Sequence, residues 1–260
     1  MPKRRLDTLL AERGLFESRN RAAAAVMAGD VRVEDQPARK PGELVADDAR
    51  LEVAPRPQFV SRGGLKLANA LDAFGLAVAG RQALDVGASS GGFTDCLLQR
   101  GAAHVVALDV AYGELHWSLR NDPRVTVIER RNARDLRADE LPYRPDLVVV
   151  DVSFISLAKV LPAVLAAAAP RYDCLALVKP QFEAGRDRVG SGGVVRDPDV
   201  RREALVAVAG SATALGASVQ RFASSGLPGP KGNRETFVHL AEGERGGVAD
   251  LDAAAREVEP

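Results

Sequence analysis

The chain has 260 residues, 46% of them hydrophobic and 27% charged, which is typical of a globular protein with one large and one small domain. Thirty-five Lys and Arg balance thirty-five Asp and Glu, so a basic surface for nucleic acid would have to come from segregated charge. We expect a cytoplasmic protein without membrane association, because the sequence shows neither an apolar run of membrane-spanning length nor the core of a signal peptide. Cys96, Cys174 and three scattered histidines lack metal-ligand spacing, so no bound metal is expected.

Residues 1–53 are expected to form a compact α+β module. After a first short helix, Ser18 is the expected N-cap of a second helix over residues 19–28. Strand-like stretches follow at 31–33 and 51–53. Six Lys or Arg outnumber three Asp or Glu within the first 21 residues. By charge alone, a solvated helix face explains this excess as well as a nucleic-acid contact does.

The spacing of residues in this module is more specific than its charge. The segments Arg5-Leu6-Asp7-x-Leu9-Leu10, Ser18-Arg19-x-x-Ala22 and Gly29-x-Val31-x-Val33 resemble the S-four RNA-binding module. In that family two helices present basic side chains to folded RNA, which is recognised by its shape and phosphates. The resemblance implies that the RNA contacts include Arg4, Arg5, Arg19 and Arg21.

A proline-stiffened linker over residues 54–60 leads to a large domain over residues 61–260. Near-continuous apolar runs, typical of parallel strands buried on both faces, alternate there with helical patterns. We therefore predict an α/β fold, a Rossmann-like doubly wound sheet that is mostly parallel with an antiparallel last strand. The expected strands are 83–86, 105–109, 125–128, 146–151, 174–179 and 236–240, and the expected helices include 114–120, 157–168 and 199–215. Two long glycine-rich loops, 180–197 and 224–234, are expected to be functional.

The first strand of this domain leads into the turn Asp85-x-Gly87-x-x-x-Gly91-Gly92. It differs from the dinucleotide fingerprint Gly-x-Gly-x-x-Gly, and its acidic residue would repel a pyrophosphate. S-adenosylmethionine, a cationic cofactor without phosphate, fits better, and Asp109 at the end of the next strand could bind its ribose hydroxyls. An ordinary tight turn without a ligand is the alternative.

This turn resembles the glycine motif of class I methyltransferases, and in particular that of the RrmJ/FtsJ-like RNA 2′-O-methyltransferases, in which an aromatic residue follows the paired glycines. Ser89-Ser90 departs from the Ala-Pro pair that is common there, which should loosen the turn slightly. The resemblance implies S-adenosyl-L-methionine as the cofactor. The residues implied to bind it are Asp85, Gly87, Ser89, Gly91, Gly92, Phe93, Thr94, Asp109, Asn132, Ala133 and Asp151.

The RrmJ/FtsJ-like family also carries a Lys-Asp-Lys-Glu tetrad, which this sequence matches with Lys66, Asp151, Lys179 and Glu235. These are the implied catalytic residues. A ribose 2′-hydroxyl is a poor nucleophile, and a lysine near carboxylates can stabilise the developing alkoxide as a cation or accept the proton when neutral. Lys179 is the candidate for this role because it directly follows an apolar strand.

Three further segments extend the resemblance along nearly the whole chain: Ser61-Arg62-Gly63-Gly64-x-Lys66-Leu67, Asp151-x-Ser153-Phe154-Ile155-Ser156 and Lys179-Pro180-Gln181-Phe182-Glu183. With the N-terminal module, they closely resemble the TlyA family, also labelled haemolysin A. That resemblance implies 2′-O-methylation of a cytidine in ribosomal RNA of the small subunit, the large subunit or both, with ribosomal RNA or ribosomal subunits as partners. The alternatives are an RNA-binding protein without catalysis and, with less support, a membrane-active haemolysin.

Overall fold

The computed structural model describes residues 2–54 and 57–259. The chain forms two compact units, Met1–Pro57 and Gln58–Pro260. Their boundary lies within the stretch 54–60, where the sequence predicts a linker. Each unit has its own hydrophobic core and is described by itself.

The small unit joins two helices to short strands around a core that includes Leu6, Leu10 and Val31. Its elements are β1 (Lys3–Arg5), α1 (Leu6–Glu12), α2 (Arg19–Ala28), β2 (Val31–Val33), β3 (Gln36–Pro37), β4 (Leu44–Ala46) and β5 (Leu51–Val53). The predicted helix over 19–28 is confirmed: the hydroxyl of Ser18 accepts a hydrogen bond from the amide of Arg21. The strands β1, β3 and β4, of two or three residues each, have no counterpart in the sequence-based prediction.

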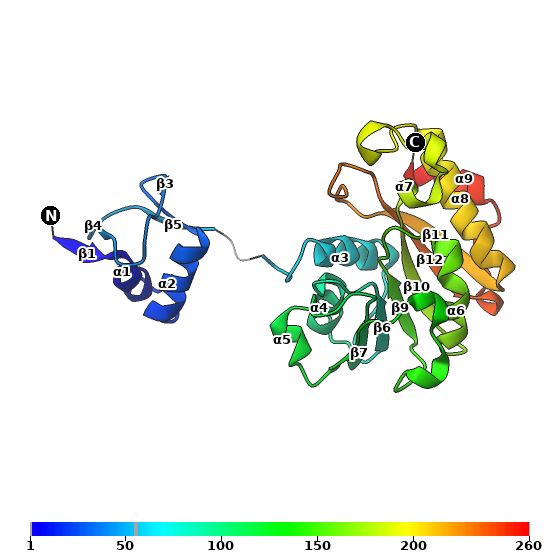
Figure 1. The fold of residues 1–260 in the computed structure, drawn as a ribbon, viewed down its shortest axis with the longest axis horizontal. Helices are drawn as coiled ribbons and strands as arrows, with labels where there is room; N and C mark the ends of the chain where they lie inside the picture. The colour runs from blue at the N-terminus through cyan, green and yellow to red at the C-terminus, as the bar shows by residue number, and fades with distance from the viewer. Residues whose placement is uncertain (1, 55–56, 260) are drawn as a thin grey trace. The chain divides into compact units, whose positions relative to one another are not determined.

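The large unit is built on a seven-stranded sheet in the order β11-β12-β10-β9-β6-β7-β8 (Figure 1). The strands are β6 (Gln82–Val86), β7 (His104–Leu108), β8 (Val125–Ile128), β9 (Leu147–Val150), β10 (Asp173–Val178), β11 (Ala217–Ser224) and β12 (Thr236–Glu242). The five strands from β10 to β8 are parallel, and β12 is antiparallel to both of its neighbours. The predicted mostly parallel sheet is therefore confirmed.

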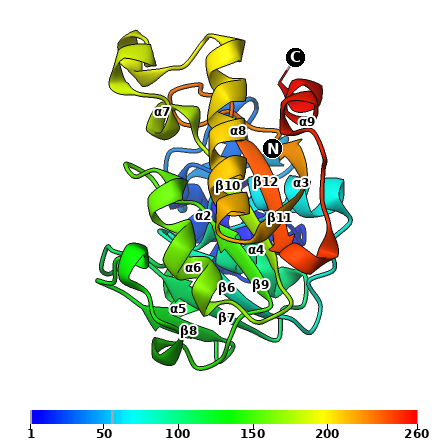
Figure 2. The ribbon, with the colours of Figure 1, turned by 90° about the vertical axis from the view of Figure 1, so that its right-hand side faces the viewer.

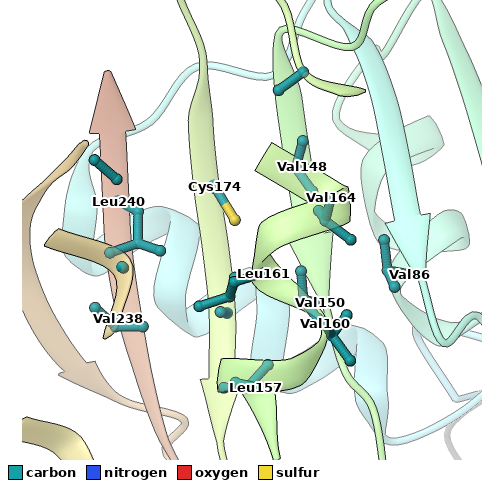
Figure 3. Packing of buried hydrophobic residues seen from close by; sticks show 14 of the residues in the cluster. Val86, Val148, Val150, Leu157, Val160, Leu161, Val164, Cys174, Val238 and Leu240 are labelled. Atoms are coloured by element: carbon teal, nitrogen blue, oxygen red, sulfur yellow. The ribbon is translucent and has the colours of Figure 1, made fainter. Parts of the chain in front are cut away.

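Helices cover both faces of this sheet. The α-helices in the described part of this unit are α3 (Gly63–Phe74), α4 (Gly92–Gln99), α5 (Trp117–Arg120), α6 (Leu161–Ala167), α7 (Pro180–Glu183), α8 (Pro198–Ala214) and α9 (Leu251–Val258). The helices α6 and α8 lie over one face (Figure 2), where Val148 and Val150 join the same hydrophobic cluster as Leu161 (Figure 3). The intervening residues of β9, Leu147 and Val149, belong to a second cluster with α3 and α4. Both faces of the central strands are thus buried, which explains their continuous apolar sequence.

The structure corrects three of the predicted elements. The edge strand β11 has no counterpart in the sequence-based prediction, because its sequence is half polar and a register shift after Val219 interrupts its pairing. The helix expected over 114–120 is shorter and begins at Trp117. The helix expected over 157–168 starts as a 3₁₀ turn at Leu157–Lys159 and becomes α-helical at Leu161.

The topology brings four chain segments to one edge of the sheet. The parallel strands β6, β9 and β10 end at Val86, Val150 and Val178. Val86 pairs with Val150, and Val150 pairs with Ala176, two residues before the end of β10. The antiparallel strand β12 begins at that same edge, because Thr236 pairs with Val178. The residues just outside these four strand ends are Gly87, Asp151, Lys179 and Glu235.

Candidate active site

A pocket of about 740 Å³ lies at this edge of the large unit. All four residues of the expected tetrad line it, together with the loop that follows β6. The two long loops that interrupt the strand and helix alternation also contribute, the first with Gln181 and Phe182 and the second with Lys231 and Asn233. The pocket therefore lies at the carboxyl ends of parallel strands, where α/β sheets usually bind their ligands.

Lys66 and Glu235 form one ion pair of the pocket. Lys66 lies in the first turns of α3, and its Nζ is 2.5 Å from Oε2 of Glu235. The side chains are 10% and 1% exposed, respectively. Transfer of a charged group from water into the protein interior is unfavourable. The attraction between Lys66 and Glu235 therefore compensates the cost of burying each charge.

Lys179 and Asp151 form the second ion pair. The Nζ of Lys179 lies 2.6 Å from Oδ1 of Asp151 and donates a hydrogen bond of 2.8 Å to Oγ of Ser153. The neighbouring ends of β9 and β10 carry both charged residues, and the sheet register sets their separation. The tetrad thus divides into two lysine–carboxylate pairs. Ser153, which the sequence analysis named only as part of a motif, directly contacts the candidate lysine.

The loop after β9 and the loop after β10 are joined by further contacts. Glu183 accepts hydrogen bonds from the hydroxyl of Ser156, at 2.6 Å, and from the amide of Leu157, at 2.8 Å. Burial raises the pKa of the Glu183 carboxyl above its ordinary value, although these hydrogen bonds oppose the shift. The rings of Phe154 and Phe182 lie 5.2 Å apart between their centroids. These contacts connect the segments that carry Asp151 and Lys179.

Phe154 is an unusual residue on the pocket wall. Its side chain is 91% exposed although it is aromatic, and its backbone has a φ of +64°, a left-handed conformation that is uncommon for residues with a side chain. Sequence reading placed it in a motif but did not assign it a role. Its exposure is a tertiary property that no local pattern reports.

The second long loop is held to the first by Asn233, whose side chain is buried. Its Oδ1 accepts a hydrogen bond from the amide of Val195, and its Nδ2 donates one to the carbonyl of Gly193, at 2.9 and 2.8 Å. Both loops line the pocket. This side chain therefore ties together two walls that are about forty positions apart in the chain.

Glycines after β6 allow close backbone packing. A Cβ added to Gly87, whose φ is +87°, would lie 2.6 Å from the carbonyl oxygen of Asp151. At Gly91, with a φ of +96°, an added Cβ would collide with Leu119 and Leu115. Two leucine side chains therefore occupy the space beside Gly91, and its contact with a cofactor stays a prediction. Gly87, Ser89, Gly92 and Phe93 line the pocket, whereas Gly91 does not.

Asp85 lies within the core rather than on the pocket wall. It is fully buried, and its Oδ2 accepts a hydrogen bond of 2.7 Å from the hydroxyl of Thr94. Its Oδ1 has no hydrogen-bond partner among the described residues. Burial raises the pKa of Asp85 to about 7, with a further contribution from the nearby Asp151 carboxylate and partial opposition from Thr94. The Asp85–Thr94 contact ties the end of β6 to the first turn of α4.

Three other expected cofactor residues lie after β7 and β8, outside the lining of this pocket. Asp109 accepts hydrogen bonds from the amides of Ser89 and Ala111, at 2.7 and 2.8 Å, and so supports the glycine-rich turn. Asn132 caps a 3₁₀ turn, Ala133–Asp135, by accepting from the amide of Arg134. Ala133 is buried. Contact of these residues with a cofactor stays a prediction.

The pocket fits S-adenosylmethionine by the chemistry of its lining. No described side chain caps the N-terminus of α4, and its first two residues, Gly92 and Phe93, line the pocket. Free amides at a helix start favour a carboxylate. The Asp151 carboxylate also lines the pocket, where it is paired with Lys179.

In the small unit, all four arginines of the expected RNA surface pair with carboxylates. Arg5 and Arg19 both bind Asp7, Arg4 binds Glu12 and Asp47, and Arg21 binds Glu17. Their side chains are still 40 to 56% exposed. Each arginine of this surface is therefore partly neutralised by a neighbouring carboxylate, and of these carboxylates Asp7 is the buried one.

The described residues show neither a cluster of metal ligands nor a membrane-spanning helix. Within residues 2–54 and 57–259, no group of three or more His, Cys, Asp or Glu side chains is arranged to hold a metal ion. No helix in that part of the chain is long and apolar enough to cross a membrane. The two cysteines, Cys96 and Cys174, are free and buried, and burial raises the pKa of each thiol to about 12.

Comparison with known proteins agrees with this geometry. Residues 59–242 match the model of the FtsJ-like methyltransferases, and residues 4–51 match the S4 domain. The 16S/23S rRNA (cytidine-2′-O)-methyltransferase TlyA of Mycobacterium tuberculosis is 54% identical over 91% of this chain and 89% of its own length. Hemolysin A of Brachyspira hyodysenteriae is 38% identical over 91% of this chain and 99% of its own length.

A solved structure from Streptococcus thermophilus, whose name marks it as a hemolysin candidate, is 39% identical and has a TM-score of 0.74. It covers 99% of this chain, and this chain matches 96% of it. The similarity thus includes both units of the chain. The chain belongs to the family of FtsJ-like methyltransferases, in the TlyA group that carries an S4 domain before the methyltransferase domain.

Proposed function

We propose that this protein methylates the 2′-hydroxyl of a cytidine in ribosomal RNA, with S-adenosylmethionine as methyl donor, and that it acts in the cytoplasm. The observation that carries the proposal is the presence of two lysine–carboxylate contacts, Lys66–Glu235 and Lys179–Asp151, in the lining of one pocket. The pocket also meets the N-terminus of α4, which can hold the carboxylate of the cofactor.

The chemistry requires a hydroxyl to become a nucleophile in line with an electrophilic methyl group. When bound, the cofactor supplies that methyl group on its sulfonium. Lys179 is the residue that acts on the hydroxyl: as an ammonium its Nζ stabilises the developing alkoxide, and as an amine it accepts the proton. Asp151 and Ser153 hold this Nζ from two sides, which keeps it at one position on the wall.

The second ion pair has a different part in this proposal. Lys66 and Glu235 are more deeply buried than Asp151 and compensate each other. Together they supply a rigid, charge-balanced wall beside Lys179. Their part is to orient the substrate hydroxyl and to keep a second cation near the developing negative charge.

Three observations support RNA as the substrate. The relative in Mycobacterium tuberculosis is named for methylation of cytidine in both 16S and 23S rRNA. The small unit presents half-exposed arginines, which suit phosphate contacts. Phe154 is an exposed aromatic at the pocket, and unstacked bases commonly stack on such side chains. An enzyme acting on a ribose within folded RNA has to separate the target nucleotide from its neighbours.

The test is a map of 2′-O-methylation across both ribosomal RNAs in cells with and without this protein. We expect one or more cytidines to lose the modification when the protein is absent, and to regain it when purified protein and S-adenosylmethionine are added to ribosomal subunits from those cells. An unchanged map, together with RNA binding but no methyl transfer in vitro, would instead identify an RNA-binding protein that has lost catalysis.

A further inference from the structure

Asp7 occupies an unusual position in the small unit. It lies in the first turn of α1 and is only 3% exposed, although most aspartates lie at protein surfaces. Arg5 donates to it twice, from Nε at 3.2 Å to Oδ1 and from Nη2 at 2.8 Å to Oδ2. Arg19, twelve residues later on α2, donates from Nε at 3.1 Å to the same Oδ2. One buried carboxylate therefore joins two arginines from separate elements.

Both arginines remain accessible despite this anchor. Their side chains are 47 and 56% exposed, respectively. Arg19 contacts Asp7 through Nε alone, and in the described part of the chain no hydrogen bond is found for its two terminal nitrogens. Those nitrogens are the fork of donors that matches a phosphate group.

A glycine makes room for the first of the two guanidinium groups. A Cβ added to Gly42 would lie 2.8 Å from Nη1 of Arg5, closer than real side chains approach. The Arg5 guanidinium thus lies beside Gly42 and is bound by Asp7. Arg5 also lies in β1, where it pairs in register with Leu44 of β4. Its backbone is therefore held by strand pairing, and its guanidinium is held by the hydrogen bonds to Asp7.

The group formed by Asp7, Arg5 and Arg19 differs in charge balance from the pairs that Arg4 and Arg21 form. Asp7 is shared by two guanidiniums, so this group keeps net positive charge. The pKa of Asp7 is lowered to about 2, chiefly by the hydrogen bond from Arg5, so it remains a carboxylate at neutral pH. Arg4 and Arg21, in contrast, pair with exposed carboxylates that compete with a phosphate for the same cation.

We infer that Asp7 is a positioning residue, which holds Arg5 and Arg19 side by side as a preformed site for a phosphodiester group of folded RNA. The inference rests on the RNA-binding role proposed above for the small unit. Its physical basis is preorganisation: a long arginine side chain loses rotamer freedom when it binds, and an anchor removes that loss in advance. The negative charge of Asp7 is buried beneath the two arginines, away from the phosphate.

A positioning role for Asp7 predicts the opposite effect on RNA affinity from that expected from charge alone. Asp7→Asn removes an acidic charge from a basic surface, which by charge alone would tighten RNA binding. Positioning predicts weaker binding, because an amide holds two guanidiniums poorly. We expect Kd to rise roughly 5- to 100-fold, the range for ordering two long side chains. The slope of log K against log salt should become shallower by about one unit if one phosphate contact is lost.

The measurement uses the full chain and purified ribosomal subunits from cells that lack the protein, titrated at several KCl concentrations. Glu17→Gln is the matched control, since Glu17 also pairs with an arginine, Arg21, but is 75% exposed. Its removal should leave Kd unchanged or lower it slightly. An affinity of Asp7→Asn equal to or tighter than that of the wild type would overturn the inference.

Two more variants separate this result from loss of folding and from failure of the proposed function. Arg5→Lys with Arg19→Lys keeps both charges and the native Asp7, but an ammonium cannot reproduce the fork that Asp7 holds. We expect weaker binding here too, and wild-type affinity would also overturn the inference. Arg5→Ala with Arg19→Ala tests the proposed role itself. If the double alanine variant binds subunits with wild-type affinity, the RNA-binding role of these arginines is wrong. If the double alanine variant binds weakly but Asp7→Asn binds with wild-type affinity, only the positioning role of Asp7 is rejected.

Discussion

Lys66 and Glu235 form a buried ion pair with 2.5 Å between Nζ and Oε2, although 169 positions separate them in the chain. One lies in the first helix of the large unit and the other just before its last strand. The pair therefore joins the beginning and end of the methyltransferase domain across its pocket. Because both side chains are withdrawn from water, it links the stability of the fold to the integrity of the site.

We expect the two members of this pair to be strongly coupled in stability. Lys66→Met or Glu235→Gln alone leaves one buried charge without its partner, which should lower the free energy of unfolding by about 3–5 kcal/mol. The double variant leaves no charge, so its loss should be smaller than the sum of the two single losses. Urea unfolding of the four proteins checks this. Additive losses would show that the ion pair contributes no coupling.

A second prediction concerns Lys179. Lys179→Met keeps most of the packing and removes the ammonium, and we expect the rate of methyl transfer to fall by at least about 10²-fold, the lower range for loss of an acid–base group. Cofactor affinity should stay nearly unchanged. The measurement is single-turnover methylation with saturating cofactor and ribosomal subunits. A full rate would remove this lysine from the chemistry.

Lys179→Arg distinguishes the two roles that a lysine can have here. A guanidinium keeps its positive charge but does not accept a proton under these conditions. We expect this variant to remain inactive in the same single-turnover assay, with normal cofactor binding as the control. Substantial activity would mean that Lys179 acts by electrostatic stabilisation and that another group takes the proton.

The raised pKa of Asp85 should make the stability of the folded protein depend on pH. Its folded-state pKa is raised to about 7, so the folded protein holds this proton more tightly than the unfolded chain does. The contribution of Asp85 to stability therefore decreases as pH rises from about 4 to about 7, and is constant above that window. Asp85→Asn has no charge to bury, so it should approach wild-type stability near pH 4 and exceed it by up to about 4 kcal/mol near pH 8.

The check for Asp85→Asn is chemical denaturation at intervals between pH 4 and pH 8. Other groups titrate in this range, so the relevant quantity is the difference between variant and wild type at each pH. A constant difference would show that Asp85 ionises with an ordinary pKa in the folded state.

Gly91→Ala tests why the turn needs a glycine. A φ of +96° is unfavourable for alanine, and the added methyl group meets Leu119 and Leu115. We expect a loss of about 2–4 kcal/mol in the stability of the protein without cofactor, from backbone strain and overpacking together. In a Leu119→Ala background the same substitution should cost less, because the overpacking is relieved while the strain remains. Unchanged stability of the cofactor-free protein, with cofactor binding lost, would favour a direct ligand contact at Gly91.

The sequence by itself was sufficient for several features of this protein. Apolar runs predicted the parallel strands, because a strand buried on both faces needs apolar residues throughout, and the N-cap at Ser18 with its following helix was predicted by local chemistry. The strand ends carrying Asp151 and Lys179 were also visible, since each is a charged residue directly after such a run. These features depend on neighbours within a few positions.

Only the tertiary structure decided which charged groups meet. The pairing of Lys66 with Glu235 requires α3 to pack beside β12, where Leu67 and Leu71 share a hydrophobic cluster with Phe237, so it depends on contacts between distant segments. The edge strand β11 escaped prediction because half of its residues are polar and its pairing is interrupted by a register shift. Gly91 and Asp7 show the same limit, since the glycine in the turn and the charge of Asp7 can be read from the local sequence. The packing of Leu119 and Leu115 against Gly91 depends on contacts between separate elements. The sharing of Asp7 by Arg5 and Arg19 depends on such contacts too.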